Sequence, residues 1–315
     1  MFSFFTKKRK SNNKKTLKKF NKQNCSPLVA GNKASPNTCY TKKILFEIKN
    51  SYNSSDLNKN KITSNDPDVV WQKLHENLVD CSVESCWLKE LDDKKLVSKI
   101  KKYIFAPEKP PEWKSNPNEW LSNVDLLEVM KQYEMKYPNF EFIGPTCIDF
   151  DDKLPENGKC VWEELCKFDL EKQIDKGKNK IGIIFNLDKH YQSGSHWVSL
   201  FVDIEIHFIF FFDSVGNEIP KEIKILVERI KKQGNSMKKN STIKFDFYEN
   251  YPTEHQYSNT ECGMYSLFFI ITMLTHNTEF KNFKTHKEVI KFFKRGRISD
   301  KFIEKYRNVY FNNVL

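Results

Sequence analysis

The sequence predicts an α+β fold in which a mixed sheet packs against one buried helix, with a helical extension before it. Three observations predict this class. Short strand-like runs gather between residues 181 and 248, residues 263–275 are apolar on nearly every side, and apolar residues at helical spacing precede both. A helix that is apolar all round is a buried one, so other elements must cover it.

The first elements are expected only after a long polar stretch. Residues 1–65 are rich in Lys, Asn and Ser without a sustained period, which predicts a disordered basic tail with at most a short element at Lys43–Ile48. Helices are expected behind Asp66, over 83–91 and over 95–104, so 66–106 is predicted to be an accessory helical segment. The proline-rich stretch Pro107–Pro111 is a stiff connector, and the main domain is predicted to be 107–315.

The net charge separates these regions. The chain has 315 residues and a formal charge of +11, but residues 1–50 carry 13 basic and one acidic side chain, and the remainder is close to neutral. A nucleic-acid-binding fold would carry the basic excess on its own surface, so the main domain is not expected to be one. Residues 7–22 remain a candidate nucleic-acid contact, and Lys7–Lys10 a candidate nuclear-import signal; a solvated tail is the favoured alternative.

The cysteines and apolar runs exclude other classes. Eight cysteines occur without a CxxC pair, so neither a metal site nor a resident cofactor is expected. We expect the thiols to be free, in a protein of a reducing compartment. The apolar runs are far shorter than a membrane span, so no membrane association is expected.

The main domain is predicted to contain a helix from about 118 to 135, strands at 181–187, 196–202, 206–212 and 243–248, and the buried helix at 263–275. A turn centred between Ile204 and Glu205 would make a hairpin of the second and third strands. His196 would then lie opposite Asp213, with apolar pairs behind them. A shift of one residue would separate the two side chains.

Cys262 is the best candidate for a group that this His–Asp pair could deprotonate. It follows a polar stretch and opens the buried helix, where the helix dipole and an imidazolium favour the thiolate form of a cysteine. Gly263 leaves room for a substrate carbonyl. The amide of Gln256 and the backbone N–H of Cys262 could hold a developing oxyanion. His190 is a rival base, but it lies in a polar loop and ranks behind His196.

Four segments together resemble the SUMO-protease and adenain group of cysteine peptidases. They contain Gly194–Trp197, Phe211–Ser214, Gln256 and Cys262–Gly263, and the gaps between His196, Asp213, Gln256 and Cys262 are 17, 43 and 6 residues. The resemblance covers roughly residues 115–275. It implies His196 as general base, Asp213 as the residue that orients it, Cys262 as nucleophile and Gln256 as oxyanion donor.

The resemblance also implies a substrate filter. In SUMO proteases, a Trp in a Trp-Leu-Asn-Asp element and the Trp after the catalytic His enclose a Gly-Gly pair. Trp197 matches the second, and Trp120 in Trp120–Asn123 matches the first; a plain core role for Trp120 is an equal alternative. Two indoles that form a narrow passage admit only glycines before the scissile bond. Asn123 replaces the family's Asp unless Asp125 takes its place, which weakens the case for a SUMO tail.

We therefore expect a thiol endopeptidase that cuts after Gly-Gly, with 107–315 as its catalytic domain. Composition and the accessory segment favour processing of viral polyproteins, as in the African swine fever virus type of large cytoplasmic DNA virus. We expect the protease to be located in the virion or the host cytoplasm, or in the nucleus if the basic cluster is an import signal. The alternatives are a protease that matures or deconjugates a ubiquitin-like modifier, and an inactive adaptor that binds modifiers or nucleic acid.

Overall fold

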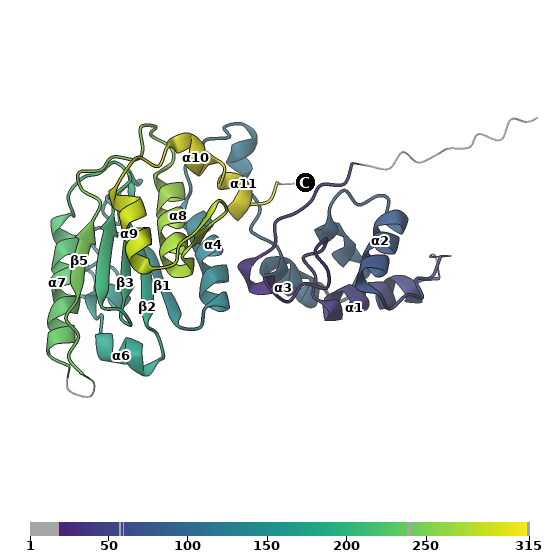
Figure 1. Cartoon of the computed structure of the whole chain (residues 1–315), viewed down its shortest axis with the longest axis horizontal. Helices are drawn as coiled ribbons and strands as arrows, with labels where there is room; N and C mark the ends of the chain where they lie inside the picture. Colours follow the sequence, from purple (N-terminus) through teal and green to yellow (C-terminus); the bar gives the residue numbers. More distant parts are fainter. Residues whose placement is uncertain (1–18, 57, 59, 238–240, 314–315) are drawn as a thin grey trace, which may run out of the picture. The chain divides into compact units, whose positions relative to one another are not determined.

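The computed structural model describes residues 19–56, 58, 60–237 and 241–313. These residues form two compact units, one that ends at Phe105 and one that begins at Ala106 and also includes Ser26–Leu28 (Figure 1). The sequence placed the start of the main domain at residue 107. Among the described helices, none is both long and apolar enough to cross a bilayer.

The N-terminal unit is helical. Its elements are α1 (Lys42–Ser54), α2 (Pro67–Asn77), the 3-10 helix η2 (Glu84–Glu90) and α3 (Lys94–Ile104). A further 3-10 turn, η1 (Pro27–Val29), is divided between the units, with Pro27 and Leu28 assigned to the C-terminal one. The helix predicted at 83–91 is therefore a 3-10 helix. A core of its own, which includes Leu45, Leu74 and Trp87, holds the unit together.

The predicted disordered tail of residues 1–65 is wrong for the part that the structure describes. Thr41 caps α1 by accepting from the backbone N–H of Ile44, and the helix buries Leu45, Ile48 and Tyr52 against its neighbours. The polar composition hid this helix because its buried side chains find partners only across the unit, in α2 and η2. The cluster Lys7–Lys10 and most of residues 7–22 lie outside the described residues.

The expectation of free thiols is also wrong for six of the eight cysteines. The structure pairs Cys25 with Cys39, Cys81 with Cys86 and Cys160 with Cys166. All eight cysteines lie in the described part, and Cys147 and Cys262 are the two that remain free. The paired cysteines are only 14, 5 and 6 residues apart, so short local loops bring each pair together.

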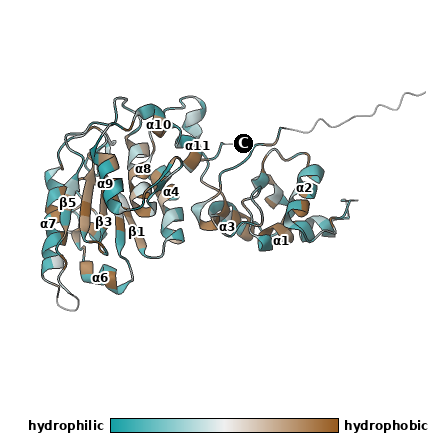
Figure 2. Ribbon diagram, viewed as in Figure 1, coloured by the Kyte–Doolittle hydropathy of each residue, from teal (hydrophilic) through white to brown (hydrophobic). Residues whose placement is uncertain are grey.

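A five-stranded mixed sheet forms the middle of the C-terminal unit, in the order β1-β2-β3-β4-β5. The outer pairs, β1 with β2 and β4 with β5, are parallel, and the inner pairs are antiparallel. The strands are β1 (Phe140–Cys147), β2 (Lys180–Asn186), β3 (Trp197–Asp203), β4 (Phe208–Phe212) and β5 (Asp246–Glu249). Figure 2 shows the central strands in brown, as expected for strands buried on both faces.

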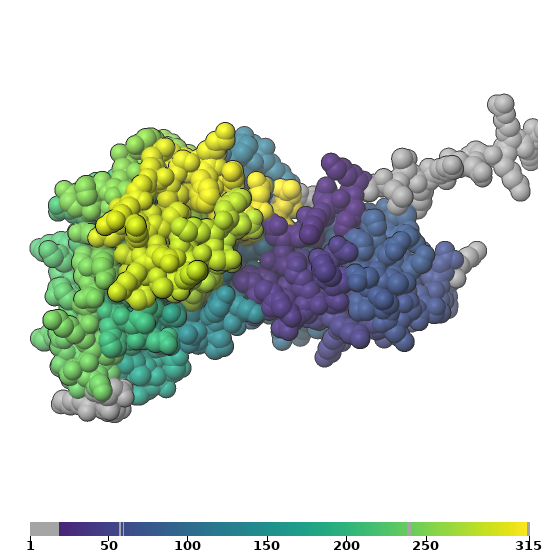
Figure 3. Space-filling model, in the orientation of Figure 1, coloured from purple at the N-terminus to yellow at the C-terminus, as the bar shows by residue number. Residues whose placement is uncertain are grey.

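Helices cover both faces of this sheet. Packed on one face are α5, α6 and α7, and on the other α4, α8 and the C-terminal helices (Figure 1). Their bounds are η3 (Pro111–Lys114), α4 (Asn123–Lys136), α5 (Glu163–Cys166), α6 (Leu170–Asp175), α7 (Lys221–Asn235), α8 (Cys262–Thr275), α9 (His286–Lys294), α10 (Asp300–Glu304) and α11 (Arg307–Tyr310), with a small ribbon of β6 (Asn277–Thr278) and β7 (Lys281–Asn282). Figure 3 shows the C-terminal residues, in yellow, as a continuous part of the surface of this unit.

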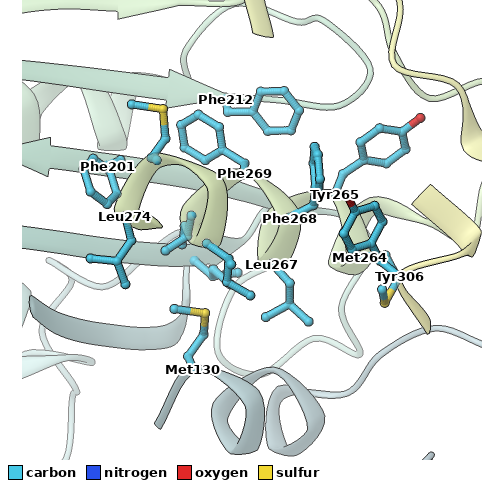
Figure 4. Close-up of a cluster of buried hydrophobic side chains, with 14 of the residues drawn as sticks. Met130, Phe201, Phe212, Met264, Tyr265, Leu267, Phe268, Phe269, Leu274 and Tyr306 are labelled. Carbon is cyan, nitrogen blue, oxygen red and sulfur yellow. The ribbon is translucent and has the colours of Figure 1, made fainter. Parts of the chain in front are cut away.

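The buried helix that the sequence predicted is α8. Its side chains from Cys262 to Leu274 are all buried. Figure 4 shows Phe201 and Phe212 of the sheet on one side of α8 and Met130 of α4 on the other. Because the helix is held on every side, the residue at its N-terminus has a fixed position relative to the sheet.

The hairpin of β3 and β4 differs from its predicted register by two residues. Leu200 pairs with Phe211 and Val202 with Ile209, and residues 204–207 form the turn. The carboxylate of Asp203 accepts from the backbone N–H groups of Glu205 and Ile206, and His207 has a φ of 61°. This side-chain turn lengthens the loop. A shift of two residues leaves every side chain on its predicted face.

Candidate active site

His196 and Asp213 meet at the open end of the hairpin, although the register does not place them directly opposite. His196 immediately precedes β3 and Asp213 immediately follows β4. The distance from Nε2 of His196 to Oδ1 of Asp213 is 2.7 Å, and the side chains are 17% and 2% exposed. Nδ1 is therefore the imidazole nitrogen left for a further partner.

The backbone of Asp213 is fixed by a residue that the sequence analysis did not identify. The side chain of Asn250, just after β5, accepts from Asp213 N–H at 2.9 Å and donates to the Asp213 carbonyl at 2.7 Å. Oδ1 of Asp213 also accepts from the N–H of Val215 at 3.0 Å. Asp213 and Asn250 are each 1% exposed. The carboxylate therefore reaches the imidazole from a rigid support.

Cys262 is the first residue of α8 and is 2% exposed. Its thiol lies close enough to the imidazole of His196 to raise the pKa of that imidazole. Together with the bond to Asp213, this contact brings three of the four predicted catalytic side chains into one connected group. The helix N-terminus adds a positive electrostatic potential at the sulfur.

The surroundings of His196 raise its pKa from 6.5 to about 9. Burial by itself lowers the pKa of an imidazole, because the charged form loses hydration. The hydrogen bond to Asp213 and the contact with Cys262, together with the charges of these two groups, outweigh burial. At neutral pH the imidazole is therefore protonated, and it lies between the Asp213 carboxylate and the Cys262 thiol.

Gln256 joins this group through Ser214, the residue after Asp213. Ser214 Oγ donates to Oε1 of Gln256 at 2.7 Å, and the backbone N–H of Gln256 donates to the Ser214 carbonyl at 2.8 Å. Nε2 of Gln256 donates to the Ser258 carbonyl at 2.7 Å, which leaves its second N–H for another acceptor. Ser214 therefore determines which end of this amide is the donor, a role that the sequence analysis missed.

Trp197 packs against the start of α8. Its Nε1 donates to the Leu121 carbonyl at 3.1 Å. A Cβ on Gly263 would lie 3.1 Å from Leu121 Cβ and 3.3 Å from Trp197 Cδ1. The glycine next to Cys262 thus permits the close approach of the segment that carries Leu121.

Trp120 is not a core residue. It is 38% exposed and, with Trp197, lines a groove of about 450 Å³. The other residues that line the groove are Leu121, Ser122, Asn123, Pro145, Thr146, Cys147, Asn186, Asp188, Lys189, His190, Gln192, Ser193 and Gly194. The two predicted substrate-binding tryptophans therefore border the same concave surface.

Asn123 lines this groove, whereas Asp125 has another role. Ser122 caps α4, and Oδ2 of Asp125 accepts from the backbone N–H of Ser122 at 2.8 Å and from its hydroxyl at 2.6 Å. This capping box also explains why α4 begins at Asn123 rather than near 118. Asp125 is thus engaged in holding the helix start.

His190 belongs to a second His–Asp pair. Its Nδ1 lies 2.7 Å from Oδ2 of Asp149, and its backbone N–H donates to the same carboxylate at 3.0 Å. The side chain is 38% exposed and lines the groove that Trp120 and Trp197 border. The structure joins His196, and not His190, to Cys262.

The loop before Cys262 is fixed by another pair that the sequence analysis missed. Glu261 is fully buried and forms an ion pair with Arg307 of α11, which is 4% exposed. The two residues are 46 positions apart, so no local pattern could have revealed the pair.

Comparison with known proteins agrees with this geometry. A model of the Ulp1 protease family, C-terminal catalytic domain, matches residues 164–305. The putative thiol protease R355 of Acanthamoeba polyphaga mimivirus is 31% identical over 294 residues, which cover 88% of this chain and 90% of the relative. A cysteine protease of African swine fever virus is 30% identical over 195 residues, covering 59% of this chain and 66% of the relative.

A solved structure shows the same fold. The crystal structure of the African swine fever virus protease superposes with a TM-score of 0.63 over 92% of this chain and 96% of that one, at 22% identity. The match includes the mixed sheet and the helical N-terminal region. The relatedness to R355 over nearly the whole of both chains establishes the family. This chain is a cysteine protease and belongs to the Ulp1 protease family.

Proposed function

We propose that this protease is an endopeptidase that cuts viral polyproteins after a Gly-Gly pair, with Cys262 as nucleophile, His196 as acid and base, and Asp213 as the residue that orients the imidazole. One observation carries the proposal: His196 contacts Asp213 through Nε2 and also contacts the thiol of Cys262. An imidazole between a buried carboxylate and a thiol at a helix N-terminus is the arrangement that thiol proteolysis needs.

The proposed reaction has two stages. The Cys262 thiolate attacks the carbonyl carbon of the second glycine, and the oxyanion is held by the Cys262 backbone N–H and by Nε2 of Gln256. As the C–N bond breaks, the His196 imidazolium donates its proton to the leaving amine, and a thioester remains. Water then attacks the thioester while Nδ1 of His196 accepts its proton, and the C–S bond breaks to release the carboxylic product and the Cys262 thiolate beside the restored imidazolium.

Selectivity for glycine would come from the packing around Gly263. Trp197 and Leu121 already lie close to this residue, and Trp120 borders the same groove. A substrate backbone that passes between the tryptophans to reach Cys262 has room for hydrogen atoms at its α carbons and little room for a Cβ. The groove beyond, toward His190, would hold the residues that precede the two glycines.

The decisive test is cleavage of a fluorogenic peptide that contains Gly-Gly-Xaa, with wild type and Cys262→Ala side by side. We expect wild type to cut after the second glycine and Cys262→Ala to be inactive but folded. Cys147→Ala, which removes the other free thiol and changes only the groove wall, should still cleave the peptide, so that loss of cleavage is specific to Cys262. Full cleavage by Cys262→Ala would refute the proposed mechanism.

Processing of a ubiquitin-like modifier is the second candidate, because the African swine fever virus relative from other isolates is named a SUMO-1 cysteine protease. Fluorogenic SUMO and ubiquitin, assayed beside the peptide, decide between the two. If kcat/KM for a whole modifier exceeds that for its C-terminal peptide by about a hundredfold or more, the surface of the modifier is recognised and deconjugation is favoured. Similar values favour polyprotein cleavage.

Contact of residues 7–22 with nucleic acid is a separate proposal. Nine of these residues are basic and none is acidic. Because Phe20 and Cys25 already pack against the core of the N-terminal unit, the test is removal of residues 1–18 alone. The full chain should bind DNA with an affinity that falls steeply with salt. Equal DNA binding by the truncated chain would rule out this contact.

A further inference from the structure

Arg307 of α11 contacts two segments that flank the site. Toward the nucleophile, Nε donates to Oε2 of Glu261 at 3.0 Å and Nη2 donates to Oε1 at 2.8 Å. Glu261 immediately precedes Cys262 and is fully buried. Nη2 also lies 3.4 Å from the Thr260 carbonyl. The loop that leads into α8 is thus held by one planar, bidentate contact.

The other contacts of Arg307 are with the segment that leads to Trp120. Nη1 donates to the carbonyl of Glu119 at 2.9 Å and to that of Pro117 at 3.3 Å. The guanidinium lies over the ring of Trp113 at 4.3 Å, and Nε1 of Trp113 donates to the same Glu119 carbonyl at 2.9 Å. The residue just before Trp120 is therefore fixed by both side chains.

A second anchor lies two residues along the same segment. The Leu121 carbonyl accepts from Nε1 of Trp197 at 3.1 Å, and Leu121 lies closest to the position that a Cβ on Gly263 would take. The segment Glu119–Leu121 is thus held by Arg307 at its start and by Trp197 at its end. Arg307 links this segment directly to the loop before Cys262.

Stability alone gives a weak reason for a buried ion pair at this place. Desolvation of two charges offsets much of their attraction, and apolar replacements are often as stable. The guanidinium has a property that an apolar group or an ammonium lacks, because its planar set of donors reaches a carboxylate on one side and carbonyls on the other at the same time. Arg307 makes both kinds of contact, with the Glu261 carboxylate on one side and with the carbonyls of Pro117 and Glu119 on the other.

We propose that Arg307 is a positioning residue that sets the spacing between the Trp120–Leu121 segment and Cys262, and through it the selectivity for glycine before the scissile bond. This inference rests on the proposed function. Arg307 itself does not touch the substrate. Its loss would let the two segments separate, so that a residue with a Cβ could enter the passage.

The test compares Arg307→Met and Arg307→Lys with wild type on matched peptides that carry Gly-Gly or Ala-Gly before the scissile bond. Arg229→Met is the control, because Arg229 also binds a carboxylate, that of Asp151, and the carbonyls of Leu165 and Cys166, but on the other face of the sheet. Melting temperature, kcat, KM and the ratio of kcat/KM for the two peptides are measured for each.

We expect the Gly-Gly preference to fall about tenfold or more in both Arg307 variants, with KM affected more than kcat. Arg307→Lys should recover the melting temperature but not the preference, since an ammonium cannot span both segments. Arg229→Met should lower the melting temperature and leave the preference intact. A wild-type preference in Arg307→Lys and Arg307→Met would overturn the proposal; if Arg307→Met does not fold, Arg307→Lys alone decides.

A measurement without any peptide keeps this test separate from the proposed function. Alkylation of Cys262 by small iodoacetamide and by a bulky fluorescein iodoacetamide is followed by mass spectrometry of the peptide that contains Cys262. In both Arg307 variants, the ratio of the alkylation rate with the bulky reagent to that with the small reagent should rise at least about threefold over wild type. An unchanged ratio counts against Arg307, whereas a wild type that fails to cut Gly-Gly peptides counts against the proposed function.

Discussion

The side-chain amide of Asn250 exchanges two hydrogen bonds with the backbone of Asp213, at 2.9 Å to its N–H and 2.7 Å to its carbonyl. The same amide also donates to the Thr253 carbonyl at 2.9 Å. Asp213 follows the last residue of β4, where the ladder no longer supports the chain. Asn250 therefore continues the support of the sheet to the residue that orients His196.

Asn250→Ala should reduce activity without removing any group that meets the substrate. It leaves the buried N–H of Asp213 without its partner, at about 1–3 kcal/mol in stability, whereas the Asp213 carbonyl still accepts from the N–H of Gly216 at 2.9 Å. We expect kcat to fall by about tenfold or more while KM changes little, since the imidazole loses its orientation. Asn139→Ala is the control, because that amide binds Asn179 at the start of β1 and β2. Equal kcat in the two variants would contradict the role of Asn250.

The pH dependence of activity should follow His196, whose pKa is raised to about 9. As pH rises through this value the imidazolium that protonates the leaving amine is lost, so kcat/KM should fall on the alkaline side. In Asp213→Asn the carboxylate that raises this pKa is gone and burial still lowers it, so the fall should begin at lower pH. Asp149→Asn alters the pair with His190, and the electrostatic environment of Cys147, but not the contacts of His196, so it should leave the profile in place. Coincident profiles for wild type and Asp213→Asn would exclude this account.

The disulfides give a prediction that can be checked by counting thiols. Alkylation of the unfolded, non-reduced chain should label two of the eight cysteines, Cys147 and Cys262. Reduction should destabilise the N-terminal unit by about 3 kcal/mol through the Cys25–Cys39 loop. It should leave alkylation of Cys262 in the folded chain unchanged, since the three bonds join other segments of the chain. Eight labelled thiols before reduction would show that the bonds do not form.

The sequence allowed prediction of those parts of the fold whose signals are local. The run from Cys262 to Leu274 is apolar on every side, and the strands around His196 and Asp213 are short apolar runs, so α8, β3 and β4 were placed within a few residues. The turn between β3 and β4 was not predicted correctly, because the length of the loop depends on the Asp203 carboxylate and on the left-handed backbone of His207. The prediction of which side chains share a face of each strand was still correct, because the error in the register was an even number of residues.

Long-range contacts explain the remaining misses. The helix α1 lies in a polar, lysine-rich stretch, and its buried residues acquire a partner only when α2 and η2 fold against them. Arg307 lies 46 residues after Glu261 and 188 after Glu119, so nothing in its own neighbourhood indicates the contact. The positions of the four predicted site residues were read from order and spacing, whereas Asn250, Ser214 and Arg307 support them through contacts that spacing does not encode.

Trp120 and Trp113 should respond in opposite ways to replacement by alanine. Trp120 is 38% exposed and borders the groove, whereas Trp113 is 6% exposed and packs on Phe311 and Arg307. Trp120→Ala should keep the melting temperature and raise KM for Gly-Gly peptides by about tenfold, since an exposed aromatic wall of the substrate groove is lost. Trp113→Ala should lose about 3–5 kcal/mol of stability. A large loss of stability in Trp120→Ala, with KM unchanged, would show that Trp120 acts as a core residue and not as a wall of the substrate groove.

Gly263→Ala tests the close packing beside the nucleophile. The added Cβ would lie 3.1 Å from Leu121 Cβ and 3.3 Å from Trp197 Cδ1, so both neighbours must move by a few tenths of an ångström. The clash is worth about 1–3 kcal/mol, and the better helix propensity of alanine offsets about 1 kcal/mol of it. Stability should therefore fall by at most about 2 kcal/mol, while kcat/KM for Gly-Gly peptides should fall by about tenfold because the passage beside Cys262 is distorted. Ser266→Ala, in the same helix, removes a buried hydroxyl without adding volume and should leave kcat/KM near its wild-type value. If Gly263→Ala matched Ser266→Ala in kcat/KM, the packing of Leu121 and Trp197 on this glycine would have no part in substrate binding.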